Sequence, residues 1–217
     1  MSVRPLPLFA FLMCTTPVSL ATTLGGVERA AMSMAMAGGA MPVVGPTIPW
    51  AQGRIAWQSS RKTGERRGPD AVMFPGKKVV ITVVANAPRH PDMSFETGGL
   101  TNPTVCVSQG ARVTLKVINM DYGPGMVHGL VITSAKPPYP LQIGRHPPHM
   151  LARIAALAPR SSSRLRAARY AEATVHFVAR RPGTYYYVCP IPGHALAFHM
   201  YGRFIVDRSP PPTPPRS

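Results

Sequence analysis

Residues 183–206 constrain the fold more strongly than any other part of this chain of 217 residues. Two runs of β-branched and aromatic residues, which are typical of strands, flank a short segment with a Pro-Gly turn at 192–193. The first run ends at Cys189, His194 follows the turn, and Met200 opens the second run. The pattern predicts a strand, a tight loop and a second strand. It therefore brings a thiol, an imidazole and a thioether to one end of two neighbouring strands.

Those three groups belong to the ligand set of a mononuclear blue copper site, which uses two His, one Cys and a weak axial Met. His128 is the candidate for the second imidazole, because it opens another apolar run after a Gly-rich approach. We predict that one copper ion, cycling between Cu(II) and Cu(I), is bound by His128, Cys189, His194 and Met200. His199 competes with Met200, but neighbouring strand residues point to opposite faces. We therefore assign His199 no metal.

Short apolar segments between Gly and Pro turns predict an all-β fold, a β-sandwich. Residues 78–85 form a nearly continuous apolar run, which is typical of a buried strand. Residues 112–119 alternate, with Val113, Leu115 and Val117 on the inner face. The remaining strands are predicted at 129–133, 174–178, 184–189 and 203–207.

Less regular segments surround and interrupt these strands. Residues 134–173 are rich in Pro and Arg, and we predict a long basic loop insertion with a short helix around 150–157. Trp50 and Trp57 indicate that part of the segment before the first strand packs on the domain. The predicted order is a signal peptide at 1–21, an irregular and partly flexible N-terminal extension at 22–76, the sandwich at 77–207 and a disordered Pro-rich tail at 208–217.

The N-terminus has the pattern of a secretory leader. A basic residue, an apolar stretch and a small-residue cleavage site occur in residues 1–21, and a second plausible cut follows residue 37. The apolar stretch is shorter than the roughly 20 residues that a membrane-spanning helix needs. We expect an exported, periplasmic protein with no transmembrane segment in its mature form.

Only three cysteines occur, and Cys14 lies in the predicted leader. Cys106 falls in a strand-like segment, where we expect a half-exposed free thiol. A disulfide between Cys106 and Cys189 is the alternative. It would remove the thiolate and with it the predicted metal site.

The chain is strongly basic, with 24 Lys and Arg against 8 Asp and Glu and a net charge of +16. Such a field favours anionic partners. No motif for nucleic-acid recognition accompanies the charge, so we expect no nucleic-acid partner. The small number of carboxylates suits an acidic environment, because paired carboxylates lose their charge and their stabilising effect as pH falls.

Several segments are similar to the cupredoxins, and within them to the rusticyanin family of acidophilic iron-oxidising bacteria. The most specific is Gly-Thr-Tyr-Tyr-Tyr-Val-Cys-x-Ile-Pro-Gly-His-Ala at 183–195, followed by Met-Tyr-Gly at 200–202. Further matches are Asn-Pro-Thr at 102–104, Ile-Asn at 118–119 and Lys-Pro-Pro-Tyr at 136–139. The similarity covers roughly residues 77–207.

This resemblance implies a Greek-key sandwich with a type 1 copper centre of high potential, on the four ligands named above. It also implies acid stability and a monomeric carrier in the periplasm that passes electrons from ferrous iron oxidation into a respiratory chain. The expected partners are redox proteins such as c-type cytochromes, which would dock near His194, where apolar residues surround the ligand.

The chain departs from the family at three points. Five residues separate His194 from Met200, where family members usually have four. Gly129 follows the first His, where a polar residue is expected. The approach to that His is one residue longer, which leaves Asn119 or Asp121 to hold the ring.

Other functions fit less well. A multicopper oxidase or copper nitrite reductase needs further ligands, typically in His-x-His pairs, and the chain has none. A Cys-His hydrolase needs an orienting group and an oxyanion hole that no motif supplies. The alternative we keep is a periplasmic copper-binding or delivery protein without an electron-carrier role, supported only by the Met-rich residues 32–41.

Overall fold

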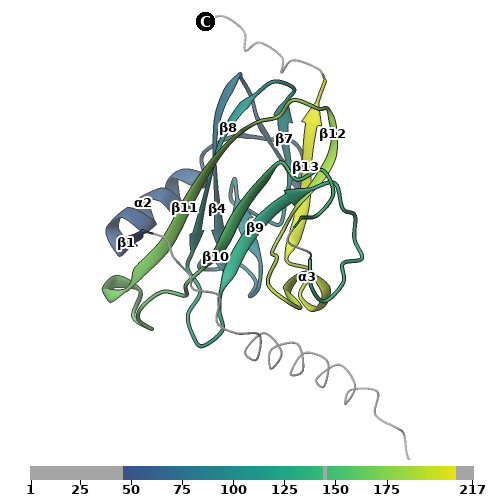
Figure 1. Cartoon of the computed structure of the whole chain (residues 1–217). Helices are drawn as coiled ribbons and strands as arrows, with labels where there is room; N and C mark the ends of the chain where they lie inside the picture. The colour runs from purple at the N-terminus through teal and green to yellow at the C-terminus, as the bar shows by residue number, and fades with distance from the viewer. Residues whose placement is uncertain (1–45, 144–145, 209–217) are drawn as a thin grey trace, which may run out of the picture.

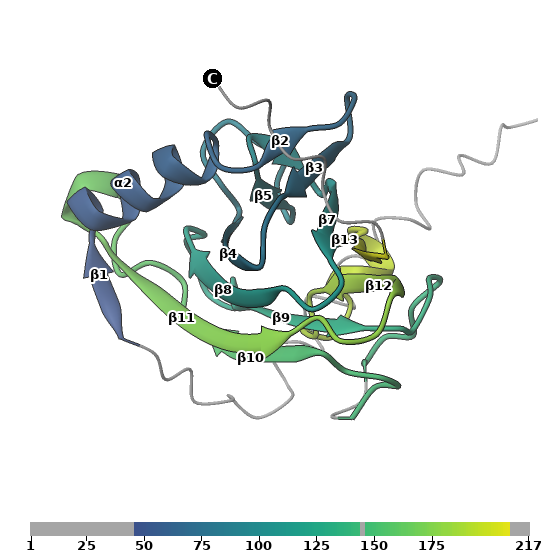
Figure 2. The ribbon, with the colours of Figure 1, turned by 90° about the horizontal axis from the view of Figure 1, so that it is seen from above.

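The computed structural model describes residues 46–143 and 146–208, which form two sheets packed face to face (Figure 1, Figure 2). The first sheet has the order β1 (Thr47–Pro49), β11 (Arg169–Val178), β8 (Arg112–Asn119), β4 (Lys78–Ala85), β5 (Phe95–Thr97) and β6 (Leu100–Thr101). The second has the order β10 (Ala152–Leu157), β9 (His128–Thr133), β12 (Gly183–Val188), β13 (Tyr201–Asp207), β7 (Thr104–Ser108), β3 (Ala71–Phe74) and β2 (Glu65–Arg66). The predicted all-β sandwich is confirmed.

The core lies between the sheets and follows the predicted alternation. In β8, Val113, Leu115 and Val117 are buried while Arg112 is exposed. They belong to one apolar cluster with residues of the facing sheet such as Phe204. Because side chains alternate along a strand, each strand contributes one face to this cluster and leaves the other to solvent or to a second layer.

The strands at 78–85 and 112–119 have the predicted bounds. The other four predicted strands are present with ends that differ by a few residues or, in β11, begin earlier, at Arg169. These strands could be predicted from the sequence because each is an apolar run between turn residues.

The helix predicted around 150–157 is wrong. This segment is the strand β10, which pairs antiparallel with β9. Ala152 and Ile154 are buried and Arg153 is exposed, which is the two-residue period of a strand. Residues 134–173 are therefore not one long loop, because β10 and the first part of β11 belong to the two sheets.

The description of the N-terminal extension as irregular is also wrong for residues 46–76. Here β1 pairs with β11, β3 pairs with β7, and the helix α2 (Trp50–Ser60) lies against one flank of the sandwich (Figure 1). The ring centres of Trp50 and Tyr170 lie 5.8 Å apart, and Trp57 is half-buried in the same cluster. The prediction that part of this segment packs on the domain is confirmed.

The predicted leader, the rest of the extension up to residue 45 and the tail from residue 209 lie outside the described residues. Within the described ranges, none of the helices has the length and apolar character that a membrane crossing requires.

Candidate metal centre

Three of the predicted ligands meet at one end of the sandwich. His128 is the first residue of β9, Cys189 follows β12 directly, and His194 opens the short helix α3 (His194–Ala197). One ligand atom of each lies within 4.8 Å of the other two, and all three residues are buried. The thiol Sγ is 3.4 Å from Nδ1 of His194 and 3.9 Å from Nδ1 of His128.

Met200 lies beside this cluster, immediately before β13, and is fully buried. The backbone N–H of Cys189 donates to the carbonyl of Met200 at 3.0 Å, which continues the pairing of β12 with β13. The two sulfur-bearing residues are therefore cross-strand neighbours, as the strand–loop–strand pattern predicts.

The chain between His194 and Met200 makes a single turn of helix. The carbonyl of His194 accepts from the N–H of Phe198 and from that of Met200, each at 3.2 Å. Between them, His199 adopts the left-handed conformation with a φ of 53°. The loop thus closes on itself and returns Met200 to the cluster, while His199 is exposed and points to the outer side as expected.

The far side of the His128 ring contacts a carboxylate. Nε2 of His128 lies 2.7 Å from Oδ2 of Asp121, which is 5% exposed. Asn119, the other candidate, holds the loop instead: its amide donates to the carbonyls of Met126 and Leu157, and its Oδ1 accepts from the N–H of Asp121. A carboxylate on the second ring nitrogen fixes the orientation of a metal-binding His and leaves Nδ1 on the side of Cys189, where it would bind a metal.

Gly129 has a packing reason that the sequence could not reveal. A Cβ at this position would lie 2.9 Å from the carbonyl oxygen of Ile154 and 3.2 Å from Cγ of Pro190. The strand β10 carries an irregularity between Ile154 and Leu157, which brings its backbone close to β9 beside His128. Only glycine leaves room for that approach.

The electrostatics of the metal-free cluster favour a thiolate. Burial alone would raise the pKa of Cys189, but its contacts with His128 and His194 outweigh that effect and lower the pKa to about 6. Burial alone would lower the pKa of His128, but hydrogen bonds to Asp121 and Cys189 raise it to about 9. A soft metal ion would meet the deprotonated sulfur it requires and would displace a proton from the histidine.

The predicted free thiols are confirmed. Cys106 and Cys189 are both unbridged, and Cys106 is partly exposed in β7. A disulfide with Cys106 therefore does not compete with a metal for the Cys189 sulfur.

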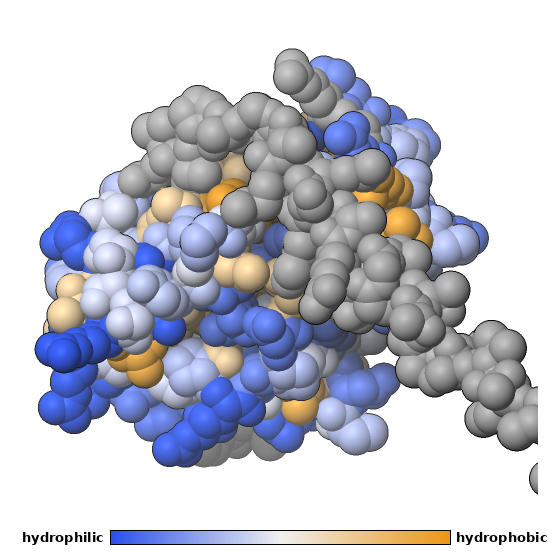
Figure 3. Space-filling view, turned by 90° about the horizontal axis from the view of Figure 1, so that it is seen from below, coloured by the Kyte–Doolittle hydropathy of each residue, from blue (hydrophilic) through white to orange (hydrophobic). Residues whose placement is uncertain are grey.

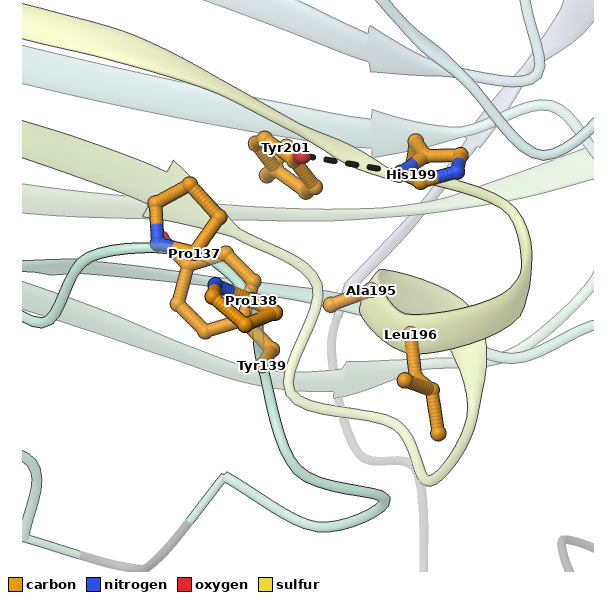
Figure 4. A pocket seen from close by; sticks show the side chains of 7 residues that line it. All are labelled: Pro137, Pro138, Tyr139, Ala195, Leu196, His199 and Tyr201. Carbon is orange, nitrogen blue, oxygen red and sulfur yellow. Dashed lines mark hydrogen bonds between the residues drawn. The ribbon is translucent and has the colours of Figure 1, made fainter.

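The surface next to the cluster is formed by α3 and the loop after β9. A pocket of about 270 Å³ is lined by Pro137, Pro138, Tyr139, Ala195, Leu196, His199 and Tyr201 (Figure 4). Leu196 is 42% exposed, whereas His194 beneath it is only 4% exposed. Seen from this end, apolar residues are scattered among hydrophilic ones outside the grey atoms (Figure 3).

Two imidazole nitrogens, a thiolate and a neighbouring thioether, all buried at one end of a β-sandwich, fit copper and define the class of blue copper cupredoxins. Rusticyanin of Acidithiobacillus ferrooxidans is 36% identical to this chain over 146 residues, which are 67% of this chain and 86% of the relative. Rusticyanin of Acidithiobacillus ferridurans is 36% identical over 146 residues, 67% of this chain and 72% of that one.

The solved structures agree. The structure of rusticyanin from Thiobacillus ferrooxidans has a TM-score of 0.65 and 31% identity, and it covers 77% of this chain and 100% of its own. A structure of reduced rusticyanin has a TM-score of 0.64 and 29% identity, with coverages of 76% and 100%. No family model matches the chain. The chain belongs to the rusticyanin family.

Proposed function

We propose that this protein is a mononuclear type 1 copper electron carrier, with His128, Cys189, His194 and Met200 as ligands, and that it is not an enzyme. The observation that carries the proposal is the buried cluster of one thiol and two imidazoles within 4.8 Å. Family membership supports the choice of copper, because the relatives of known structure include the copper protein rusticyanin in a reduced form.

The copper ion supplies the one-electron couple between Cu(II) and Cu(I). The residues of the chain supply a site that changes little between those states. His128 is held by Asp121, Cys189 is paired across the strand with Met200, and the cluster excludes water. A dry site with a thioether next to the metal favours Cu(I), and we therefore propose a high reduction potential.

The electron enters and leaves through the His194 side. His128 is fully buried, whereas His194 lies just beneath the surface of α3, next to the exposed Leu196. We propose that redox proteins such as c-type cytochromes dock on this end, with the protein acting as a monomer. An apolar contact that brings the partner's cofactor close to His194 would shorten the electron path.

The place in the cell belongs to the same proposal. We propose that the leader exports the protein to the periplasm and that the carrier serves a respiratory chain linked to ferrous iron oxidation. Its sparse carboxylates, 8 Asp and Glu in 217 residues, suit an acidic compartment.

A copper titration tests the site. Cu(II) added to the purified protein should give an intense visible thiolate-to-copper band that bleaches with a reductant. Cys189→Ala should lose the band, while Cys106→Ala, which removes the other described free thiol, should keep it. A colourless complex would instead favour a copper-delivery protein, and an unchanged band in Cys189→Ala would overturn the ligand assignment.

The docking face is tested by a matched pair of surface variants. Leu196→Asp on α3 should slow electron exchange with a c-type cytochrome in stopped-flow mixing while the visible band stays unchanged. Ile55→Asp on α2 is the control, because Ile55 is 59% exposed but lies on another flank (Figure 1). Equal effects of the two variants would contradict docking near His194.

A further inference from the structure

Arg160 makes an unusual set of contacts for a residue in an Arg-rich surface segment. It follows β10 and contacts the segment Met120–Tyr122, which follows β8. Its backbone N–H donates to the carbonyl of Asp121 at 2.8 Å, and its Nε donates to the carbonyl of Met120 at 3.1 Å. Its guanidinium lies 5.0 Å from the ring centre of Tyr122. Arg160 thus contacts three consecutive residues.

The guanidinium is itself fixed. Nη1 of Arg160 donates to the carbonyls of Ser162 at 2.8 Å and Ser163 at 2.6 Å. None of the ion pairs found in the described ranges includes Arg160. The hydrogen bonds of its side chain go to backbone carbonyls. Arg160 therefore holds the backbone in place and does not neutralise an acid. The planar fork of an arginine can serve several carbonyls at once, which the single ammonium of a lysine cannot.

The segment that Arg160 holds carries Asp121. This carboxylate accepts from the N–H of Tyr122 at 2.7 Å through one oxygen and contacts Nε2 of His128 at 2.7 Å through the other. A shift of the segment would therefore move the carboxylate against the ring. The ring orientation in turn decides where Nδ1 of His128 points relative to Cys189.

We propose that Arg160 is a positioning residue for the metal centre: it locks Met120–Tyr122 and, through Asp121, sets the orientation of the His128 ring. The inference rests on the proposed function in that His128 is taken as a ligand. It gives one arginine of the 153–169 segment, the half-buried Arg160, a role in the site.

The test compares Arg160→Lys and Arg160→Gln with Arg164→Gln. Arg164 lies in the same segment and is exposed, and its side chain makes no hydrogen bond, ion pair or cation–π contact among the described residues, so it controls for the loss of a positive charge. Outer partners of metal ligands typically contribute ten- to hundredfold to metal affinity. We expect both Arg160 variants to lose about tenfold in Cu(II) affinity and to shift the visible band. Arg164→Gln should do neither.

A readout without copper separates this inference from the proposed function. In the metal-free protein, the ¹⁵N shifts of the His128 ring should report a changed hydrogen bond between Nε2 and Asp121 in Arg160→Lys. In the background of Asp121→Asn, the same arginine change should have no further effect, because the route through Asp121 is already lost. Failure of the wild-type protein to form a blue complex would end the proposed function and leave this test standing.

Three results would overturn the inference. The first is unchanged His128 ring shifts in both Arg160 variants. The second is an Arg164→Gln effect as large as that of Arg160→Lys. The third is an undiminished Arg160→Lys effect in the Asp121→Asn background, which would mean that Arg160 does not act through Asp121. If Arg160→Gln does not fold, the charge-conserving Arg160→Lys carries the comparison.

Discussion

The two histidines of the metal centre are held in opposite ways. His128 is fully buried, and its ring is fixed by Asp121. The segment of Asp121 is held by the nearby Asn119, whose amide also donates to the carbonyl of the distant Leu157, and by the distant Arg160. His194 opens a four-residue helix, and the hydrogen-bond partner of its ring is its near neighbour Cys189. One side of the site depends on long-range contacts and the other on a local turn. A change in the loop after His194 should therefore disturb the His128 side less than a change around Asp121.

The largest expected effect on stability comes from replacing each of the two histidines in the metal-free protein. His128→Ala should lower the free energy of unfolding by about 3 to 5 kcal/mol, because it leaves the buried carboxylate of Asp121 without its partner. His194→Ala should cost clearly less, since that ring contacts no carboxylate. Unfolding in guanidinium chloride measures both. Equal losses would mean that the two sides are not fastened differently.

The sequence revealed the local side better than the long-range side. The strand–loop–strand at 183–206 was visible because its ligands and turn lie within one short segment. Asp121 was one of two candidates only, because the sequence does not show which of two nearby polar side chains turns toward the ring. The contacts of Arg160 were not visible at all, because they join segments 40 residues apart. The strand β10 was mistaken for a helix because its alanines give a weak alternation and its identity comes from pairing with β9.

The second effect tests the close approach of β10 to His128. Gly129→Ala should destabilise the protein by about 1 to 3 kcal/mol, because the new Cβ would meet the Ile154 carbonyl oxygen and force the strands apart. The matched change Gly53→Ala in α2 should stabilise by up to about 1 kcal/mol, since alanine favours a helix. There the new Cβ would lie at an ordinary 3.5 Å from Tyr170.

Thermal unfolding of the two glycine variants, with and without copper, gives the measurement. If Gly129→Ala is as stable as the wild type, the backbone of β10 can move away from β9 at little cost. The His128 side of the metal centre would then be less rigid than its contacts indicate.

The third effect is a pH dependence of the metal-free protein. The pKa of His128 is raised from 6.5 to about 9, so its stabilising contribution is complete below pH 6.5 and is lost as pH rises through 9. The pKa of Cys189 is lowered from 9.0 to about 6, so its contribution is complete above pH 9 and is lost as pH falls through 6. Between these values the two slopes oppose each other.

Removing the thiol should therefore uncover the slope of His128. Metal-free Cys189→Ala should lose stability as pH rises above 6.5, because Asp121 still favours the protonated ring, while the wild-type protein changes little. Denaturant midpoints at several pH values give the answer, with Cys106→Ala as the control for loss of a thiol. A flat profile for Cys189→Ala would show that Asp121 does not hold the proton on His128.

The smallest expected effect concerns the local side. His199 has a φ of 53°, a conformation that costs a residue with a side chain about 1 to 2 kcal/mol but costs glycine little. His199→Gly should leave stability within about 1 kcal/mol of the wild type, because relief of this strain is offset by a more flexible unfolded chain. His199→Val should destabilise, since a β-branched residue is poorly accommodated there.

The copper band then tests what the turn at His199 does. Asn102 donates to the carbonyl of His199 at 3.3 Å, a bond that His199→Gly leaves in place, so Met200 should return to the same position and the spectrum should not change. In His199→Val the β-branched side chain disfavours the left-handed conformation of the turn. Met200 should then move relative to Cys189, which alters the band. A spectrum that is the same in both variants would mean that β13, and not the turn, places the thioether. The position of Met200 on the His194 side would then also depend on long-range pairing and not on the local turn.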